Sequence, residues 1–535
     1  MNRSRRHPVL PALFALSTAL PLAALSDTAT WIGGTGNWTD ATNWSPEVVP
    51  NDAAETDPRT DVLIDGNAGN ASSVTWALTT SDVSDHYLGN LTIGEGDSLT
   101  FTGKPGGSGS TYSRLRLGQL SNSGVLTMNG PSANKSHGNE FLLSIGGPVD
   151  APFNTATGQL VFKSISNYRR CHNFVDLPGI AQNDGYFWVE SRMTQNAGHV
   201  TVRFYSPGDE MVFTNNGNVF LVGKGDGDSW VTFSPLLTNH VFTLAGTGTV
   251  HLASATGPGN DNYRARAMIA AIASGIQFIH ASSHSIVGCG DIGRSGSGGN
   301  SNGQGKIGVQ HFQSVINEGT ILAQRYISET EELRSTISDL SITAGSGMVS
   351  NAPTGKIVIG TPTEGAAVAI GAASGSFINA GLLEVAAGST CSNACTTTLA
   401  DSSVLRFGIN ASVLSLEEFE EIHAQWEEAQ PAPSEEPGEE PGEEPENPEP
   451  EPILRSILNV SNALVFGGRI ELAEGSRPQI GATYRLATCN PGQLTTTQYT
   501  IVRSPSLPAF SLRIDSVAGT VDAYFPPPET VILLQ

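Results

Sequence analysis

The sequence predicts an all-β protein folded as a right-handed parallel β-helix. A short phrase recurs along the 535 residues: a small polar residue, then Gly, then apolar residues at every second position. Copies begin at Asn122, Asn196, Asn215, Asn317 and Asn379. Turn signals followed by strands of period two, without helical segments between them, are typical of stacked β coils. A pair of β-sandwich domains is the alternative all-β interpretation.

The composition agrees with this class. The chain has 60 Gly and only 15% charged residues, which suits many short strands joined by turns better than helices. The intervals between turn glycines are irregular, so the repeat is not strict. We expect Gly at these turns because it permits positive φ, and we expect the Val, Ile and Leu that follow it to stack between neighbouring coils.

The first 26 residues predict a secretory signal peptide. Basic residues precede an apolar run from Val9 to Leu25, and Ala24 and Ser26 suit the −3 and −1 positions of a cleavage site. The run is short for a bilayer span and contains prolines, which disfavours a membrane anchor. We therefore expect a secreted protein, located in the extracellular space or at the outer cell surface, with no membrane insertion by this chain itself.

The remaining chain divides by composition. We expect a Trp/Gly-rich cap at 27–75, a β-helix at 76–412, a short helix at 413–426, a disordered Glu/Pro linker at 427–453, and C-terminal β-helix coils with a cap at 454–535. The net charge is −23, and eleven glutamates lie in 427–452, so −12 is left for the rest. This acidity disfavours nucleic acid as a partner.

Three tryptophans, Trp31, Trp38 and Trp44, lie between Gly-rich turns near the start of the mature chain. Indole rings at this place can fold over the open end of a β-helix and cover backbone groups that would otherwise recruit another chain. The alternative is a glycan-binding platform, because exposed indoles pack on sugar rings.

The cysteines and acidic turns give few candidates for a site. Five cysteines are too few for a disulfide scaffold, but Cys391 and Cys395 could form one local disulfide. Asp226 and Asp228 lie in a single Gly-rich turn that partly resembles a calcium-binding nonapeptide, although such sites need tandem copies. We expect no cofactor or structural metal.

Catalytic motifs are also lacking. Glycoside hydrolysis needs two carboxylates facing one groove, and no acidic pair stands in such a motif with a nearby His and Arg. His280 and His284 show no specific pattern. The sequence therefore predicts no catalytic residues. It does not predict the oligomeric state.

Both ends of the chain carry a resemblance. The N-terminal Trp31-Ile32-Gly33-Gly34-Thr35-Gly36-Asn37-Trp38 and the later Phe466-Gly467-Gly468-Arg469-Ile470 resemble secreted autotransporter-like β-helix proteins of Gram-negative bacteria, whose passengers carry autotransporter-associated β-strand repeats. The resemblance implies a non-catalytic structural or adhesive element at the cell surface, with glycans or other cell-surface proteins as partners. The alternative is a β-helix that binds or degrades polysaccharide, of lyase or glycosidase type.

Overall fold

The structure is a computed structural model of the whole chain. The residues it describes are 27–50, 59–65, 71–105, 111–130, 139–146, 151–166, 171–193, 198–205, 210–225, 229–236, 238, 240–254, 265–293, 296–298, 307–325, 339–361, 365–372, 375–409, 458–474, 476–478, 482–505 and 507–526. The signal peptide, the short helix and the Glu/Pro linker expected from the sequence lie outside these residues.

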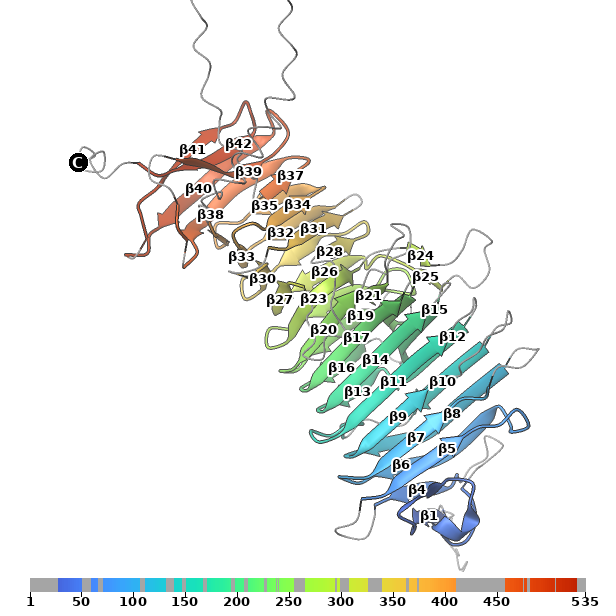
Figure 1. Cartoon of the computed structure of the whole chain (residues 1–535). Coiled ribbons are helices and arrows are strands. Elements are labelled where there is room, and N and C mark those ends of the chain that lie inside the picture. Colours follow the sequence, from blue (N-terminus) through green and yellow to red (C-terminus); the bar gives the residue numbers. More distant parts are fainter. Residues whose placement is uncertain are drawn as a thin grey trace, which may run out of the picture.

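The chain winds into an elongated parallel β-helix, with the N-terminal coils at one end and the C-terminal strands at the other (Figure 1). Each regular coil places one strand in a first, a second and a third parallel sheet in turn. The predicted fold class is confirmed.

The strands of the first sheet are β6 (Asp85–Ile93), β8 (Thr111–Asn122), β10 (Asn139–Ile145), β12 (Cys171–Pro178), β15 (Gly198–Tyr205), β18 (Ser229–Pro235), β21 (Arg266–Ile269), β23 (Ser285–Ile292), β28 (Asp339–Ala344), β31 (Ala367–Ala372), β34 (Thr390–Asn393), β37 (Leu458–Val460) and β39 (Thr483–Thr488). The second halves of β6 and β8 continue into the second sheet.

The other strands of the second sheet are β1 (Thr28–Trp31), β4 (Asp61–Ile64), β13 (Ile180–Asn183), β16 (Glu210–Asn215), β19 (Val241–Ala245), β22 (Gln277–His280), β26 (Ser314–Asn317), β29 (Val349–Asn351), β32 (Ser376–Asn379), β35 (Thr396–Leu399) and the start of β38 (Leu464–Leu472).

The strands of the third sheet are β2 (Thr35–Asn37), β5 (Ser73–Ala77), β7 (Ser98–Thr102), β9 (Val125–Asn129), β11 (Gln159–Ser166), β14 (Tyr186–Met193), β17 (Asn218–Gly225), β20 (Thr249–Ser254), the start of β23, β27 (Thr320–Ala323), β30 (Lys356–Ile359), β33 (Leu382–Val385), β36 (Val404–Phe407), the end of β38 and β40 (Leu494–Val502).

The remaining elements lie outside this repeat. They are the 3-10 turn η1 (Ala41–Asn43), β3 (Trp44–Ser45), which is antiparallel to β1, the hairpin β24 (Gly296–Gly298) and β25 (Ile307–Val309), and the antiparallel β41 (Ser511–Asp515) and β42 (Thr520–Tyr524). No helix in the described part of the chain is long and apolar enough to span a membrane.

Strand alternation builds the core. Along most strands buried and partly exposed residues alternate, because successive side chains point to opposite faces of a sheet. Inward-pointing Phe, Leu, Ile and Val side chains stack from coil to coil. For example, the ring centroid of Phe141 lies 6.0 Å from that of Phe101 and 5.2 Å from that of Phe162. Each coil therefore covers the apolar surface of the next, as in other solenoids.

A ladder of buried amides runs through the turn between the second and third sheets. The side-chain nitrogen of each Asn donates to the side-chain oxygen of the Asn in the next coil, at 2.6–2.8 Å. The ladder has two segments, which consist of Asn122, Asn154, Asn183 and Asn215, and of Asn317, Asn351 and Asn379. The Asn of the recurring sequence phrase supplies four of these members, so the phrase marks a buried hydrogen-bond ladder as well as a turn.

Two histidines join the ladder segments. Asn215 Nδ2 lies 3.1 Å from His284 Nε2, His284 Nδ1 lies 3.1 Å from His280 Nε2, and His280 Nδ1 lies 2.7 Å from Asn317 Oδ1. An amide nitrogen only donates and an amide oxygen only accepts, so both imidazoles are neutral and carry their proton on Nδ1. The donor direction is thus the same through all nine side chains.

The turn glycines are needed for a reason other than the one expected from the sequence. Gly217 and Gly381 do not have positive φ. A Cβ on Gly217 would lie 2.0 Å from the carbonyl oxygen of Gly185 in the preceding coil, and one on Gly381 would lie 2.2 Å from that of Gly355. The turns stack so closely that only glycine fits, and the expected positive φ is wrong for these positions.

The β-helix begins earlier in the chain than the predicted domain limit. β1 and β2 already pair in parallel with β4 and β5, so the first coil begins within 27–75 rather than at 76. At the other end β37 stacks in parallel on β34, and β38 on β35 and β36. The described strands on either side of 410–457 therefore belong to consecutive coils, which agrees with a Glu/Pro linker at 427–453 inserted within the solenoid.

The candidate disulfide is not formed. Cys391 and Cys395 are free thiols and both are buried. Cys391 lies on β34 among core side chains, and burial raises its pKa to about 12. The Cys395 thiol donates instead to Asn393 Oδ1 at 3.0 Å. Their closeness in sequence suggested a bridge, but the strand carries each thiol into its own packing site.

Candidate functional site

The Trp cluster closes the N-terminal end of the solenoid. Trp31, Trp38 and Trp44 are each at most 2% exposed. Trp44 packs edge-on against the other two, and Trp38 stacks on Trp76 of β5 at 4.2 Å. Their indole nitrogens donate to the backbone oxygens of Gly34, Pro50 and Trp38 respectively. These rings offer no open face to a sugar, so the glycan platform expected as an alternative at Trp31, Trp38 and Trp44 is not present.

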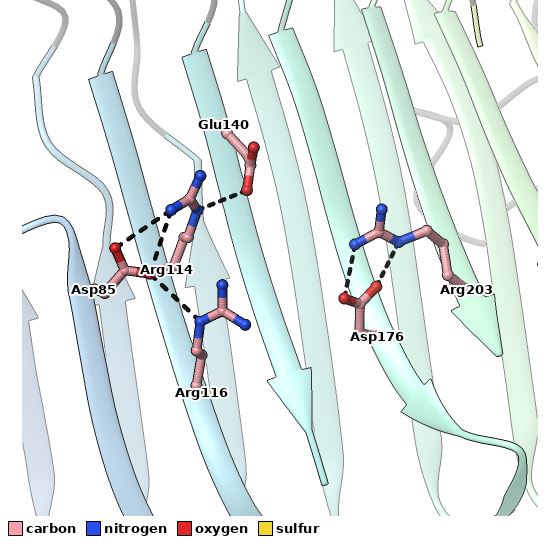
Figure 2. A network of polar contacts seen from close by, with 6 residues as sticks. All are labelled: Asp85, Arg114, Arg116, Glu140, Asp176 and Arg203. Atoms are coloured by element: carbon pink, nitrogen blue, oxygen red, sulfur yellow. Dashed lines mark hydrogen bonds and ion pairs between the residues drawn. The ribbon is translucent and has the colours of Figure 1, made fainter. Parts of the chain in front are cut away.

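A network of ion pairs covers part of the outer face of the first sheet. Arg114 of β8 lies between Glu140 of β10 at 2.7 Å and Asp85 of β6 at 3.3 Å, and Arg116 also reaches Asp85 (Figure 2). The hydrogen bond to Glu140 raises the pKa of Arg114.

A second pair continues this line on the next two strands. Asp176 of β12 accepts two hydrogen bonds from Arg203 of β15, at 2.5 and 2.7 Å (Figure 2). The Arg203 guanidinium also lies 3.7 Å from the ring centroid of Phe174. Because each of these carboxylates already holds a guanidinium, the network is a cross-strand stabilising device and has no carboxylate poised for proton transfer.

The most unusual surface is a row of side chains on the outer face of the third sheet, all apolar except for one histidine, which we call the apolar stripe. Its members are partly exposed, occupy the same outward position in seven successive coils and are paired in register. They are Val161, Trp188, Phe220, His251, Val287, Leu322 and Val358. Soluble proteins seldom expose long contiguous apolar rows, and such rows mark interaction surfaces.

The stripe has defined limits along the solenoid. It begins after Thr127 and ends at Glu384, beyond which the same row becomes ionic. Arg406 there binds Glu384 and Glu471, at 3.0 and 2.9 Å. The row is thus apolar in the middle coils and charged at its C-terminal end.

The rings of the stripe pack on one another. The ring centroid of Phe220 lies 5.4 Å from that of Trp188 and 4.4 Å from that of His251. The ring planes of Phe220 and His251 are 5° apart. Trp188 Nε1 donates to Glu190 Oε2 at 3.1 Å, and His251 Nε2 lies 3.3 Å from Asn218 Oδ1. Burial lowers the pKa of His251 to about 4, so the stripe is uncharged at neutral pH.

The candidate calcium ligands cannot be placed. Asp226 and Asp228 lie outside the described residues. Within the part of the chain that the structure describes, no group of three or more His, Cys, Asp or Glu side chains could hold a metal ion.

The stripe was not recognised in the sequence, because its neighbouring members are 27 to 36 residues apart and only the coil register brings them together. The outward aromatic residues of Tyr186-Phe187-Trp188 were the available signal, since they alternate with the buried Phe187. A single strand with this pattern does not indicate a continuous row.

The geometry defines this chain as a three-sheet parallel β-helix protein with a closed N-terminal end, a polar ladder inside and an apolar stripe outside. The comparisons with known proteins add no relative: no family model, curated protein or solved structure matches the chain.

Proposed function

We propose that the chain is a secreted, non-catalytic β-helix protein that acts as a structural or adhesive element at the cell surface. The observation that carries this proposal is the long outer surface of the solenoid, which has the apolar stripe on its third sheet and self-paired charged groups on its first sheet. Such a surface suits contact with another macromolecule. The terminal resemblance to autotransporter-like passengers and the signal-peptide pattern support the export of the chain.

The rigidity of the rod supports the same proposal. Nine buried side chains form one continuous hydrogen-bonded ladder, and core side chains stack between adjacent coils. Buried polar groups that are hydrogen-bonded to one another rigidify a fold and specify one packing. A rigid rod holds a contact surface away from the cell at a fixed orientation.

The proposal has a direct test in two parts. The chain is expressed with its own first 26 residues and located by fractionation and by antibody labelling of intact cells. The mature chain, residues 27–535, is then assayed for binding to cells and for release of reducing ends or unsaturated sugars from a panel of polysaccharides.

We expect export, binding to cells and no sugar release. Retention of the chain in the cytoplasm would contradict the proposed location, and sugar release would favour the alternative of a polysaccharide lyase or glycosidase.

A further inference from the structure

We infer that the outer face of the second sheet binds a second copy of this chain, so that two solenoids lie side by side and run in the same direction. The face consists of the outward positions of six successive strands, β19, β22, β26, β29, β32 and β35. The inference goes beyond the proposed function, because it concerns a different surface and depends neither on export nor on binding to cells. Two-fold pairing through one self-complementary patch is the commonest form of assembly.

A row of outward side chains runs along the centre of this face, in register from coil to coil. Every member is partly exposed, and every member except one serine is β-branched. The members are Thr243, Ile279, Ile316, Ser350, Ile378 and Thr398. β-branched side chains have few rotamers, so little side-chain entropy is lost when another surface covers this central row.

Two further rows flank the central row, because residues two positions apart on a strand point to the same face. The row that precedes it on each strand, the wide row, comprises Val241, Gln277, Ser314, Met348, Ser376 and Thr396. The row that follows it, the narrow row, comprises Ala245, Ala281, Glu318, Ala352, Ala380 and Ala400. All members of both rows are at least partly exposed. The face is therefore open across its full width.

The charge of this face favours a neutral partner. Glu318 is the only charged side chain in the three rows, although the whole chain carries a net charge of −23. The outer face of the first sheet, in contrast, carries the ion pairs of Figure 2. The three rows contain no Lys or Arg to attract an anionic partner and no aromatic ring on which a sugar could stack. A second copy of the same face supplies the neutral surface.

The sizes of the side chains select the direction of pairing. A two-fold axis parallel to the solenoid, between the two faces, places the wide row of one copy on the narrow row of the other. Met348 then meets Ala352 of the second copy, and the Ser314 hydroxyl meets the Glu318 carboxylate. An axis along the strands would place the wide row on itself and the narrow row on itself, which crowds one side and leaves gaps on the other. Close packing at interface cores favours the first axis.

The central row lies on the first axis and meets itself. Ile279, Ile316 and Ile378 each face the same residue of the second copy, so apolar side chains leave water along the length of the contact. The two sheets then pack face to face with their strands nearly aligned, at a distance of about 10 Å, which is a common packing of β-sheets.

The size of the face predicts a weak dimer. With a coil spacing of about 4.8 Å, six coils cover about 29 Å, and three outward positions on a strand cover about 20 Å. This corresponds to about 600 Å² per copy and about 1,200 Å² in total, at the low end of specific interfaces. Association is therefore expected in the micromolar range and must be measured up to high concentration.

The experiment is sedimentation of the mature chain, residues 27–535, across micromolar concentrations. Ile316→Lys and Ile316→Glu are each expected to weaken dimerisation about 100-fold, because each places two like charges opposite one another on the axis. An equimolar mixture of the two variants is expected to recover a dimer, since Lys of one copy then faces Glu of the other.

The matched control is Val358→Lys on β30. Val358 is also a partly exposed outward residue, but it belongs to the apolar stripe on the third sheet. This variant is expected to dimerise like the parent. Circular dichroism and thermal unfolding verify that every variant keeps the fold.

A cross-linking experiment tests the direction of pairing. Ile316→Cys and Ile378→Cys are treated separately, and as a mixture, with a short bis-maleimide. Each variant is expected to form a cross-linked dimer alone, because each position faces itself. The parent gives the background, since its Cys289, Cys391, Cys395 and Cys489 are buried.

Four results would overturn the inference: a parent that is monomeric at all concentrations, dimerisation of Ile316→Lys equal to that of the parent, no recovery in the mixture of charged variants, or cross-linking of the Cys variants only when they are mixed. Loss of the dimer in Val358→Lys would move the contact to the third sheet and overturn it as well. Sugar release or retention in the cytoplasm would contradict the proposed function and leave the pairing untouched, so the two failures are distinguishable.

Discussion

His284 donates a hydrogen bond from Nδ1 to Nε2 of His280, at 3.1 Å, inside the solenoid. Their outer nitrogens face Asn215 and Asn317, whose amides leave only one protonation pattern. The ladder has no Asn in the coil of β19, because Gly246 lies there in register with Asn215 of the preceding coil. The His pair bridges this gap. Both rings are buried.

The His pair predicts a loss of stability in acid. Burial lowers the pKa of His280 to about 4 and that of His284 to about 3, below the value of about 6.5 in the unfolded chain. Above pH 6.5 both states are neutral and the pair has no pH effect. As the pH falls from 6.5 towards 4, the unfolded chain binds protons that the folded chain does not, so the free energy of unfolding decreases by about 3 kcal/mol per His.

The measurement is denaturant unfolding at pH 7.0, 5.5 and 4.5. The double variant His280→Asn and His284→Gln is expected to be less stable at pH 7 but to lose less stability in acid than the parent. Gly34→Ala, a change without a titratable group at a position where nothing lies within 4 Å of an added Cβ, is the control and should keep the parent's slope. An unchanged slope in the double variant would contradict the assignment.

The amide ladder predicts a graded cost along its length. Asn351 accepts from Asn317 and donates to Asn379 and to the backbone oxygen of Leu382. At the acceptor end, among the described residues nothing donates to Asn122 Oδ1. Because an unsatisfied buried polar group costs about 1–3 kcal/mol, Asn351→Ala should destabilise more than Asn122→Ala, by about 1 kcal/mol. Chemical denaturation of both variants measures the difference, and a reversed order would refute the direction of the ladder.

The stacked turns predict a steric cost at Gly217. An added Cβ there meets the Gly185 and Asp184 carbonyl oxygens at 2.0 and 2.6 Å. Backbone atoms cannot move away as a flexible side chain can, so Gly217→Ala should lower stability by about 2 kcal/mol or more. Gly34→Ala is the control, since nothing lies within 4 Å of that position. Thermal unfolding should leave the control near the parent, and equal melting temperatures for both variants would contradict the steric reason.

The Trp cap predicts a local effect. Trp38→Ala removes a fully buried ring that stacks on Trp76, and such a truncation costs about 3–5 kcal/mol. Because coils contact mainly their neighbours, hydrogen exchange should accelerate in β1, β4 and β5 and stay unchanged in β30 and β33. Uniform acceleration along the chain would show that the solenoid unfolds as one unit and that the ring is not a local cap.

The fold class and the places of many coils follow from the sequence alone. Its alternation of apolar residues after Asn–Gly turns sufficed, because strand alternation and turn chemistry are local properties. The strand pattern that resumes after the Glu/Pro linker 427–453 also predicts that the linker is inserted within the solenoid, and β37 does stack on β34.

Which of these residues come together depends on the stacking of the coils. The ladder of Asn122 to Asn379 and the apolar stripe join side chains about 30 residues apart, and the His280–His284 link brings His284 to Asn215, 69 positions earlier in the chain. Irregular loops separate the coils, so the register cannot be counted along the chain. Burial likewise reversed the expectation at Trp31, Trp38 and Trp44, because whether an indole is open to a ligand depends on what the first coil places over it.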